Sequence, residues 1–217
     1  MSKPKLLDLF AGAGGAGEGY ARAGFDVTGV DINPMPRNPH RFIQANAMDV
    51  LRDWDFLGQF DAIHASPPCQ AWTPLGALHP DKTYPELIEP VRQALFNRGI
   101  PWVIENVMTA PLVKENSIVL CANTFGLRTY RHRRFESHLN LTAPPHLPHT
   151  TRTATRQRRE RWAEGWHISI TGDVGTYCGP EAMGIDWMDG NELCQAIPPA
   201  FTEHIGRQLL ARLAVPA

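Results

Sequence analysis

The sequence lacks the features that would place the protein in a membrane or mark it for export. Within its 217 residues, no apolar run approaches the ~20 residues that a transmembrane helix needs. The first residues, MSKPKLLDLF, have neither the apolar core nor the small-residue cleavage site of a signal peptide. No internal repeat is evident. We therefore expect a cytoplasmic protein with no membrane partner.

Cysteine is scarce, which excludes a second group of protein classes. The four cysteines form no C-x-x-C pair, so neither a zinc ribbon nor a disulfide framework is expected. His146 and His149 have H-x-x-H spacing in a proline-flanked loop, but nothing nearby in the sequence supplies further ligands, so no metal site is expected. The cysteines stand far apart, at Cys69, Cys121, Cys178 and Cys194.

A net charge of −1 conceals an uneven distribution. Residues 128–161 contain nine arginines against two acidic residues, a local charge of +7, whereas the remainder carries 12 basic and 20 acidic residues, a charge of −8. A basic band on an acidic body favours a polyanionic partner that meets one face. The alternative is an arginine-rich helix and loop that face solvent.

Short apolar runs alternate with helical patterns through the first half of the chain. This alternation predicts an α/β fold with a doubly wound, mostly parallel sheet, whose ligands gather at the carboxyl ends of the strands. Expected strands are 5–10, 26–32, 41–47, 60–66 and 101–107, and expected helices are 14–23, 48–54 and 84–98.

This rhythm breaks from residue 136 to residue 165. The run NLTAPPHLPHTT predicts a loop, and TATRQRRERWAEG predicts a polar helix. Apolar patterning resumes over 167–172, and a helix is expected around 200–213. We therefore divide the chain into a core (1–135), an appendage (136–179) and a part that returns to the core (180–217).

The glycine-rich stretch DLFAGAGGAGEG raises two alternatives. Gly12, Gly14 and Gly17 fit G-x-G-x-x-G, and Asp31 follows at about the distance that a dinucleotide site requires. The turn is equally suited to another cofactor that carries adenosine. The glycines alone do not decide between them.

The stretch SPPCQ places Cys69 after two prolines, just beyond an expected strand. A thiol on a stiff turn at the ligand edge is placed like a nucleophile, although a buried structural cysteine is the commoner case. Glu105 closes the next strand and projects toward the same edge, unless it caps a helix. No histidine partner for the thiol is evident, because His64 is expected to be buried in the sheet. A cysteine hydrolase is therefore disfavoured.

Taken together, these motifs resemble the cytosine-C5 DNA methyltransferase family. The stretches DLFAGAGG, GVDI, PPCQ and ENV, the pair Arg131 and Arg133, and QAIPPAFTEHIG (195–206) occur in that family's order, over most of 5–135 and 180–206. The resemblance implies a Rossmann-like class I methyltransferase with a small basic appendage. The core would then bind S-adenosylmethionine, and 136–179 would be a reduced target-recognition segment. A dinucleotide enzyme would have no use for SPPCQ.

The resemblance also assigns roles to residues. Cys69 would add to C6 of cytosine, Glu105 would hold or protonate N3, and Arg133 and Arg131 would steady the flipped nucleotide and the active site. Asn46 stands where the family usually has an aspartate. The residues implied for the cofactor are Asp8, Phe10, Ala11, Gly12, Gly14, Gly15, Asp31, Ile32, Asn46, Ala47 and Pro67.

The partner implied is double-stranded DNA with its target base flipped out, and a monomer is favoured. The same chemistry on RNA or on a free cytosine nucleotide is an alternative, because the recognition segment is short. A catalytically silent nucleic-acid-binding relative is another. The residues expected to contact nucleic acid are Gln70, Arg152, Arg156, Arg158, Arg159 and Arg161.

Overall fold

A seven-stranded sheet organises the computed structural model, which describes residues 2–73, 81–96, 98–155, 159–171 and 177–214. The strand order is β3-β2-β1-β4-β5-β7-β6. Strands β1 to β5 are parallel, and β7 is antiparallel to both β5 and β6. The predicted doubly wound, mostly parallel α/β fold is confirmed. The strands of this sheet are β1 (Lys5–Leu9), β2 (Asp26–Asp31), β3 (Arg41–Gln44), β4 (Ala62–Ala65), β5 (Trp102–Asn106), β6 (Ser117–Cys121) and β7 (His132–Glu136).

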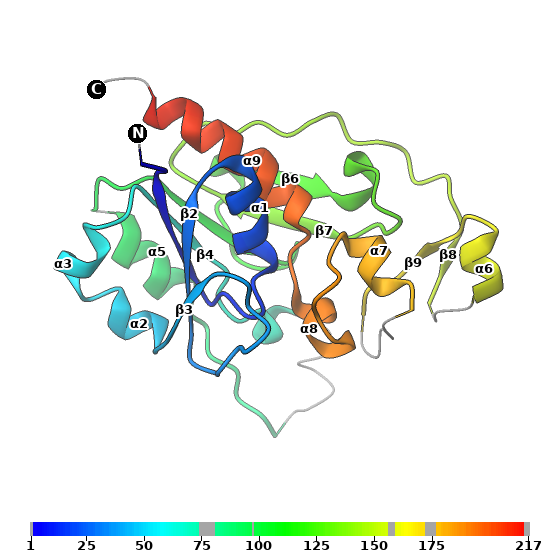
Figure 1. Cartoon of the computed structure of the whole chain (residues 1–217), viewed down its shortest axis with the longest axis horizontal. Coiled ribbons are helices and arrows are strands. Elements are labelled where there is room, and N and C mark those ends of the chain that lie inside the picture. Colours follow the sequence, from blue (N-terminus) through cyan, green and yellow to red (C-terminus); the bar gives the residue numbers. More distant parts are fainter. Residues whose placement is uncertain (1, 74–80, 97, 156–158, 172–176, 215–217) are drawn as a thin grey trace.

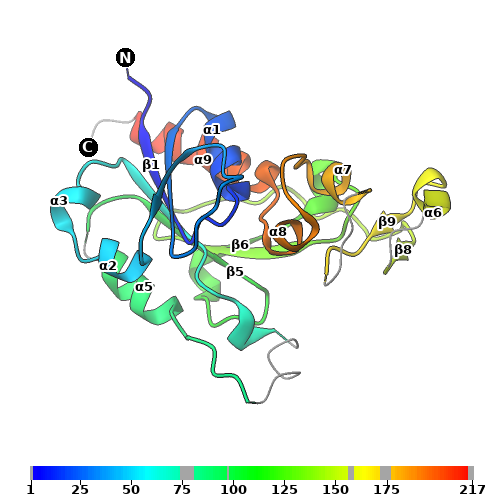
Figure 2. The ribbon, with the colours of Figure 1, turned by 60° about the horizontal axis from the view of Figure 1, so that its bottom comes forward.

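Helices cover both faces of the sheet, so the central strands are apolar on both sides (Figure 1). One apolar cluster joins Leu7 and Leu9 of β1 to α5, and another joins Leu6 of the same strand to α1 and α9. Figure 2 shows α1 and α9 on one side of the sheet and α2 and α5 on the other. The helices are α1 (Gly15–Ala23), α2 (Ala47–Val50), α3 (Trp54–Leu57), α5 (Ile88–Phe96), α6 (Arg159–Ala163), α7 (Gly179–Met183), α8 (Gly190–Gln195) and α9 (Pro199–Leu213), with 3-10 turns η1 (Gln70–Trp72), η2 (Lys114–Asn116) and η3 (Ala122–Phe125).

Two segments differ from the sequence prediction. The helix expected over 48–54 is two short helices, because Asp53 caps a new helix by accepting from Phe56 N. The polar helix expected from residue 153 is wrong at its start. Thr153–Ala154 forms β8 and pairs in parallel with β9 (His167–Ile168), because the Ala154 side chain is buried in that small sheet. Only α6 (Arg159–Ala163) is helical there, and residues 156–158 lie outside the described residues.

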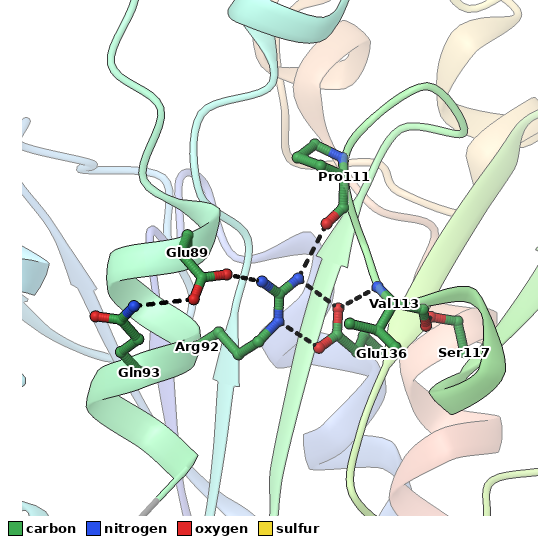
Figure 3. A network of polar contacts seen from close by, with 7 residues as sticks. All are labelled: Glu89, Arg92, Gln93, Pro111, Val113, Ser117 and Glu136. Carbon is green, nitrogen blue, oxygen red and sulfur yellow. Dashed lines mark hydrogen bonds and ion pairs between the residues drawn. The ribbon is translucent and has the colours of Figure 1, made fainter.

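A buried ion pair fixes the end of β7 (Figure 3). Arg92 of α5 donates from Nε to Glu136 Oε1 at 2.6 Å and from a terminal nitrogen to Oε2 at 2.9 Å. Glu136 is buried and also accepts from Val113 N at 2.8 Å. The same guanidinium contacts Glu89 and the Pro111 carbonyl. Strand β7 is thereby fastened to α5 at the end opposite His132.

The appendage extends from one end of the sheet, with β8, β9 and α6 farthest out (Figures 1 and 2). A third apolar cluster connects it to the core through Trp162, Met183 and Leu193. Trp187 Nε1 donates to the Ala13 carbonyl at 2.8 Å, so this cluster packs against the glycine-rich turn. No helix in the described part of the chain is long and apolar enough to cross a membrane.

Candidate active site

The turn between β1 and α1 adopts a conformation that exposes its backbone. Phe10 has a φ of 59°, Gly12 of 50° and Gly14 of 86°. At Gly14 a side chain would also be 2.9 Å from Asn38 Oδ1, so glycine is required there for both reasons. Gly12 has nothing within 4 Å of the position its Cβ would take. The turn therefore leaves open space beside a backbone at the carboxyl end of β1.

Asp31 is held at the carboxyl end of β2 by two backbone groups. Its Oδ2 accepts from Gly12 N at 3.0 Å, and its Oδ1 accepts from Asn33 N at 3.0 Å. The carboxylate is thereby fixed beside the glycine-rich turn. Ile32, the next residue, is 63% exposed and presents an apolar surface at the same edge.

Asn46 caps the short helix α2. Its Oδ1 accepts from Met48 N at 2.9 Å, and the next residue, Ala47, is buried. Capping uses one lone pair of the side-chain oxygen, and the amide NH₂ makes no hydrogen bond to another described residue.

Asp8 is buried at 1% exposure on the α1 face of β1. Neither carboxylate oxygen makes a hydrogen bond of acceptable geometry with another described residue, although the Gly17 N–H lowers the pKa of this acid. Burial is the larger effect and raises the pKa of Asp8 to about 8. The ionised form of such a buried acid costs stability.

Cys69 follows β4 on a loop that is tied to both neighbouring strands. Ser66 N donates to Leu9 O at 3.1 Å, and Asn106 Nδ2 donates to Pro67 O at 2.8 Å. Cys69 itself is partly exposed and precedes η1. The loop therefore presents the thiol at the carboxyl ends of β1, β4 and β5.

Glu105 and Arg133 form the charged pair of the site. Arg133 Nε lies 2.9 Å from Glu105 Oε1, with both side chains largely buried. That oxygen makes no hydrogen bond of acceptable geometry within the described part of the chain. Burial raises the pKa of Glu105, and Arg133, Arg131 and a hydrogen bond from Ser66 oppose the shift.

Two arginines also affect the pKa of the Cys69 thiol. Burial raises the pKa of Cys69, Arg133 lowers it, Glu105 raises it and Arg131 lowers it. These mutual effects place Cys69, Glu105, Arg131 and Arg133 in one electrostatic group. The thiol is the resting form, and the two guanidiniums favour its deprotonation.

Arg131 is buried and bridges the core to both the appendage and the C-terminal part of the chain. It donates to the Ile170 carbonyl at 3.0 Å and to the Cys194 carbonyl at 2.7 Å. Burial lowers its pKa to about 9. Its hydrogen bonds go to backbone, whereas Arg133 pairs with the acid.

A chain of buried polar groups leads to Glu105 from α1. Tyr20 OH lies 3.0 Å from His64 Nδ1, and His64 Nε2 lies 2.8 Å from Ser66 Oγ. Burial lowers the pKa of His64 to about 3, so the ring is neutral. Tyrosine can then donate to Nδ1, Nε2–H to Ser66, and Ser66 to Glu105.

The expected nucleic-acid contacts lie on the appendage and on the loop after Cys69. Arg152 and Arg161 lie over the Trp166 ring at 5.6 Å and 5.0 Å, and Arg159 lies over Tyr177 at 4.5 Å. None of these three forms an ion pair with another described residue. Arg156 and Arg158 lie outside the described residues, and Gln70 begins η1 beside the thiol.

Three contributors were not singled out from the sequence. The sequence patterns place Tyr20 in an expected helix, and Ser66 and Asn106 in expected strands, without a role in the site. A polar residue at the close of an apolar strand is the signal that could have marked Ser66 and Asn106. The burial of His64 in the sheet is confirmed.

Comparison with known proteins gives partial matches to one group of enzymes. The chain is 33% identical over 122 residues to the Type II methyltransferase M.XorII of Xanthomonas oryzae pv. oryzae, covering 49% of this chain and 29% of that protein. It is 28% identical over 81 residues to M.NgoPII of Neisseria gonorrhoeae, covering 34% and 24%. The chain thus spans less than a third of the length of these curated relatives. No family model matches.

Solved structures match over nearly the whole chain at low identity. A DNA modification methyltransferase encoded within a prophage of E. coli aligns with a TM-score of 0.63 at 15% identity, covering 98% of this chain and 100% of that one. The Dnmt2 methyltransferase of S. pombe aligns at 0.63 with 14% identity, covering 99% and 100%. The chain has the Rossmann-like fold of these methyltransferases. At such identities the alignments show the fold alone.

Proposed function

We propose that the protein is an S-adenosylmethionine-dependent methyltransferase that modifies C5 of cytosine in DNA. The observation that carries this proposal is the Arg133–Glu105 pair at 2.9 Å in one electrostatic group with the Cys69 thiol. A nucleophile beside a buried acid and a cation suits attack on a pyrimidine ring. The matched Type II methyltransferases support the reaction class.

S-adenosylmethionine is the methyl donor and supplies an electrophilic methyl group on a sulfonium. The residues suited to hold it line the carboxyl ends of β1 and β2. The open space at Gly12, the fixed carboxylate of Asp31 and the exposed Ile32 fit an adenosine. The buried, unpartnered Asp8 is an acid that a cationic ligand would favour. Also assigned to this site are Phe10, Ala11, Gly14, Gly15, Asn46, Ala47 and Pro67.

Cys69 performs the covalent step. Its thiolate adds to C6 of cytosine, and the electron pair displaced from the C5–C6 double bond moves toward N3. Glu105 supplies or holds the proton at N3, so negative charge does not accumulate in the ring. A raised pKa suits Glu105 to that task, because it favours the protonated form of the acid. Arg133 positions the carboxyl group.

The remaining steps restore the ring. C5, now enamine-like, would take the methyl group as the donor's sulfur–carbon bond breaks and leaves a neutral thioether. The N3 proton would return to Glu105, and C5 would then lose its own proton to a base. Release of that proton lets the Sγ–C6 bond break, which regenerates the Cys69 thiolate and the aromatic pyrimidine. A cytosine stacked in a duplex is out of reach of the thiol, so the base must leave the helix. Arginines on the appendage would contact phosphates.

A duplex that contains 5-fluorocytosine tests the proposal. Fluorine cannot leave as a proton, so the adduct should persist and shift the protein on a denaturing gel when S-adenosylmethionine is present. Cys69→Ser should give no adduct, and Cys194→Ser serves as the matched control. Absence of an adduct with any cytosine-containing nucleic acid would contradict the covalent mechanism.

The substrate class is tested separately. Incorporation of a labelled methyl group should favour duplex DNA over tRNA and over free dCMP. Preference for tRNA or for dCMP would retain the chemistry and reject DNA as the substrate. Binding of DNA without incorporation, undiminished in Cys69→Ser, would indicate a silent relative.

A further inference from the structure

We infer that the protein holds a structural zinc ion between the edge of its sheet and the loop that leads to the appendage. The ligands are the thiolate of Cys121 and the imidazoles of His132, His146 and His149. This site is separate from the cofactor and nucleotide sites and does not depend on the proposed function.

Four donor atoms converge there from three parts of the chain. One ligand atom from each of the four residues lies within 4.8 Å of every other. His132 Nε2 is 3.1 Å from His146 Nε2, and Cys121 Sγ is 3.4 Å from His149 Nε2. In tetrahedral zinc, bond lengths of about 2.05 Å to nitrogen and about 2.3 Å to sulfur imply separations of about 3.4 Å and about 3.6 Å for such pairs. The spacing of these two pairs is therefore close to that of ligands on one ion, and the remaining pairs lie within 4.8 Å.

From the sequence, no metal site is expected, because only the H-x-x-H pair His146 and His149 is recognisable as ligands. The other two donors come from strands β6 and β7, where Cys121 and His132 are directly opposite each other in the antiparallel ladder. Their separation in the sequence gives no hint of this pairing. A thiolate with three imidazoles is a donor set that suits zinc.

The histidine loop has little else to fix it. Residues 144, 145 and 148 are prolines, which lack a backbone donor. Among described residues, the backbone of 143–150 makes one hydrogen bond to the rest of the chain, from Leu147 N to Thr124 Oγ1 at 3.5 Å. His146 and His149 are nevertheless turned toward the buried Cys121, although both are largely exposed. A bound ion would account for that arrangement.

The surrounding groups orient two of the ligands. The Tyr130 ring stacks on His149 at 3.9 Å, and the Tyr130 backbone makes a hydrogen bond with His132. A second hydrogen bond of this kind is what commonly fixes the ring orientation of a metal-binding histidine.

The position of the site suggests its role. His132 stands between Arg131, which bridges to the C-terminal part of the chain, and Arg133, which pairs with Glu105. Fixing His132 would hold the start of β7 and the loop to the appendage at the same edge as Cys69. The four ligands would therefore act by holding these segments in place, not by contacting a substrate.

Metal content and cobalt spectroscopy test the inference without any measurement of activity. The 217-residue chain, purified without chelators, should carry close to one zinc per chain. After removal of the metal, added Co²⁺ should give tetrahedral d–d bands and a thiolate-to-cobalt charge-transfer band. The double variant His146→Ala/His149→Ala should lose both. Its loop is exposed, so circular dichroism should show a folded chain.

Two controls keep the ligand set falsifiable. His138→Ala removes an exposed imidazole beyond the other end of β7, and Cys69→Ser removes a thiol elsewhere; both should retain the metal. Cys121→Ser should lose the charge-transfer band. Zinc-free protein that also shows no cobalt bands on titration would overturn the site, and cobalt bands without the charge-transfer band would overturn Cys121 as a ligand.

Discussion

Arg133 Nε stands 2.9 Å from Glu105 Oε1 and also lowers the pKa of the Cys69 thiol, so one guanidinium serves both reacting groups of the proposed site. Strand β7 brings this arginine to the edge where β4 and β5 end. The pKa of the Cys69 thiol therefore reports whether Arg133 is in place.

Arg133→Gln should make Cys69 harder to deprotonate. Burial already raises the pKa of the thiol, and removing the cation that opposes this shift raises it further. The pH dependence of Cys69 alkylation by iodoacetamide, followed by mass spectrometry, should move to higher pH. Methylation should fall by about 100-fold, the loss typical of removing one preorganised donor. Arg134→Gln, on the opposite face of β7, is the control, and an equal shift there would contradict the assignment.

Ser66→Ala should raise the pKa of Glu105. The Ser66 hydrogen bond favours the ionised carboxylate, so its loss leaves burial less opposed. The infrared band of the protonated carboxyl group, assigned by its absence in Glu105→Gln, should persist to higher pH than in the wild type. Ser169→Ala should leave that band unchanged. A band that disappears at the same pH in Ser66→Ala would exclude the hydrogen-bonded chain from His64.

Asp8→Asn should alter how stability depends on pH. The Asp8 carboxyl ionises near 3.8 when unfolded and at about 8 when folded. The folded state therefore binds more protons between these values, and wild-type stability should fall as pH rises from about 4 to about 8. At ~1.4 kcal/mol per pH unit, the loss is at most about 6 kcal/mol.

Urea unfolding of the cofactor-free protein measures this effect. Asp8→Asn should match the wild type near pH 4 and exceed it near pH 8, whereas Asp26→Asn, an exposed acid, should follow the wild-type curve. Parallel curves for Asp8→Asn and the wild type would show that Asp8 is ionised in the folded protein.

Arg92→Met should destabilise the fold, because it leaves Glu136 buried without its cation (Figure 3). Breaking a buried pair on one side costs about 3 kcal/mol or more. Arg52→Met, which removes an exposed pair with Asp49, should change the free energy of unfolding by less than about 1 kcal/mol. Adding Glu136→Leu to Arg92→Met should recover much of the loss. A loss in Arg92→Met no larger than in Arg52→Met would argue that the pair is solvated.

The appendage arginines should set the salt dependence of DNA binding. Each phosphate contact contributes a slope of about 0.9 in log affinity against log salt. Arg152→Ala, Arg159→Ala and Arg161→Ala should each flatten the slope by about that amount, because none is neutralised by an acid within the described structure. Arg212→Ala, at the end of α9, should not. An unchanged slope would show that these side chains face solvent and do not contact phosphates.

Much of the sheet and part of the site could be predicted from the sequence. Runs such as KLLDL and WVIEN are apolar because both faces of β1 and β5 are covered. Each of these strands can therefore be recognised from its own residues. The carboxyl ends of parallel strands share one edge, and that rule predicts that Asp31, Cys69 and Glu105 lie at the same edge of the sheet.

Antiparallel pairing and burial were decided by the tertiary structure. Strand β7 has the sequence HRRFE, with Phe135 as its one apolar residue, because its charged side chains meet partners from other elements. Thr153–Ala154 became a strand since His167–Ile168 lies beside it. Cys121 and His132 face the two loop histidines only after β6 and β7 pair. Local patterns report how a segment is covered, whereas partners far apart in the chain are fixed when the whole sheet forms.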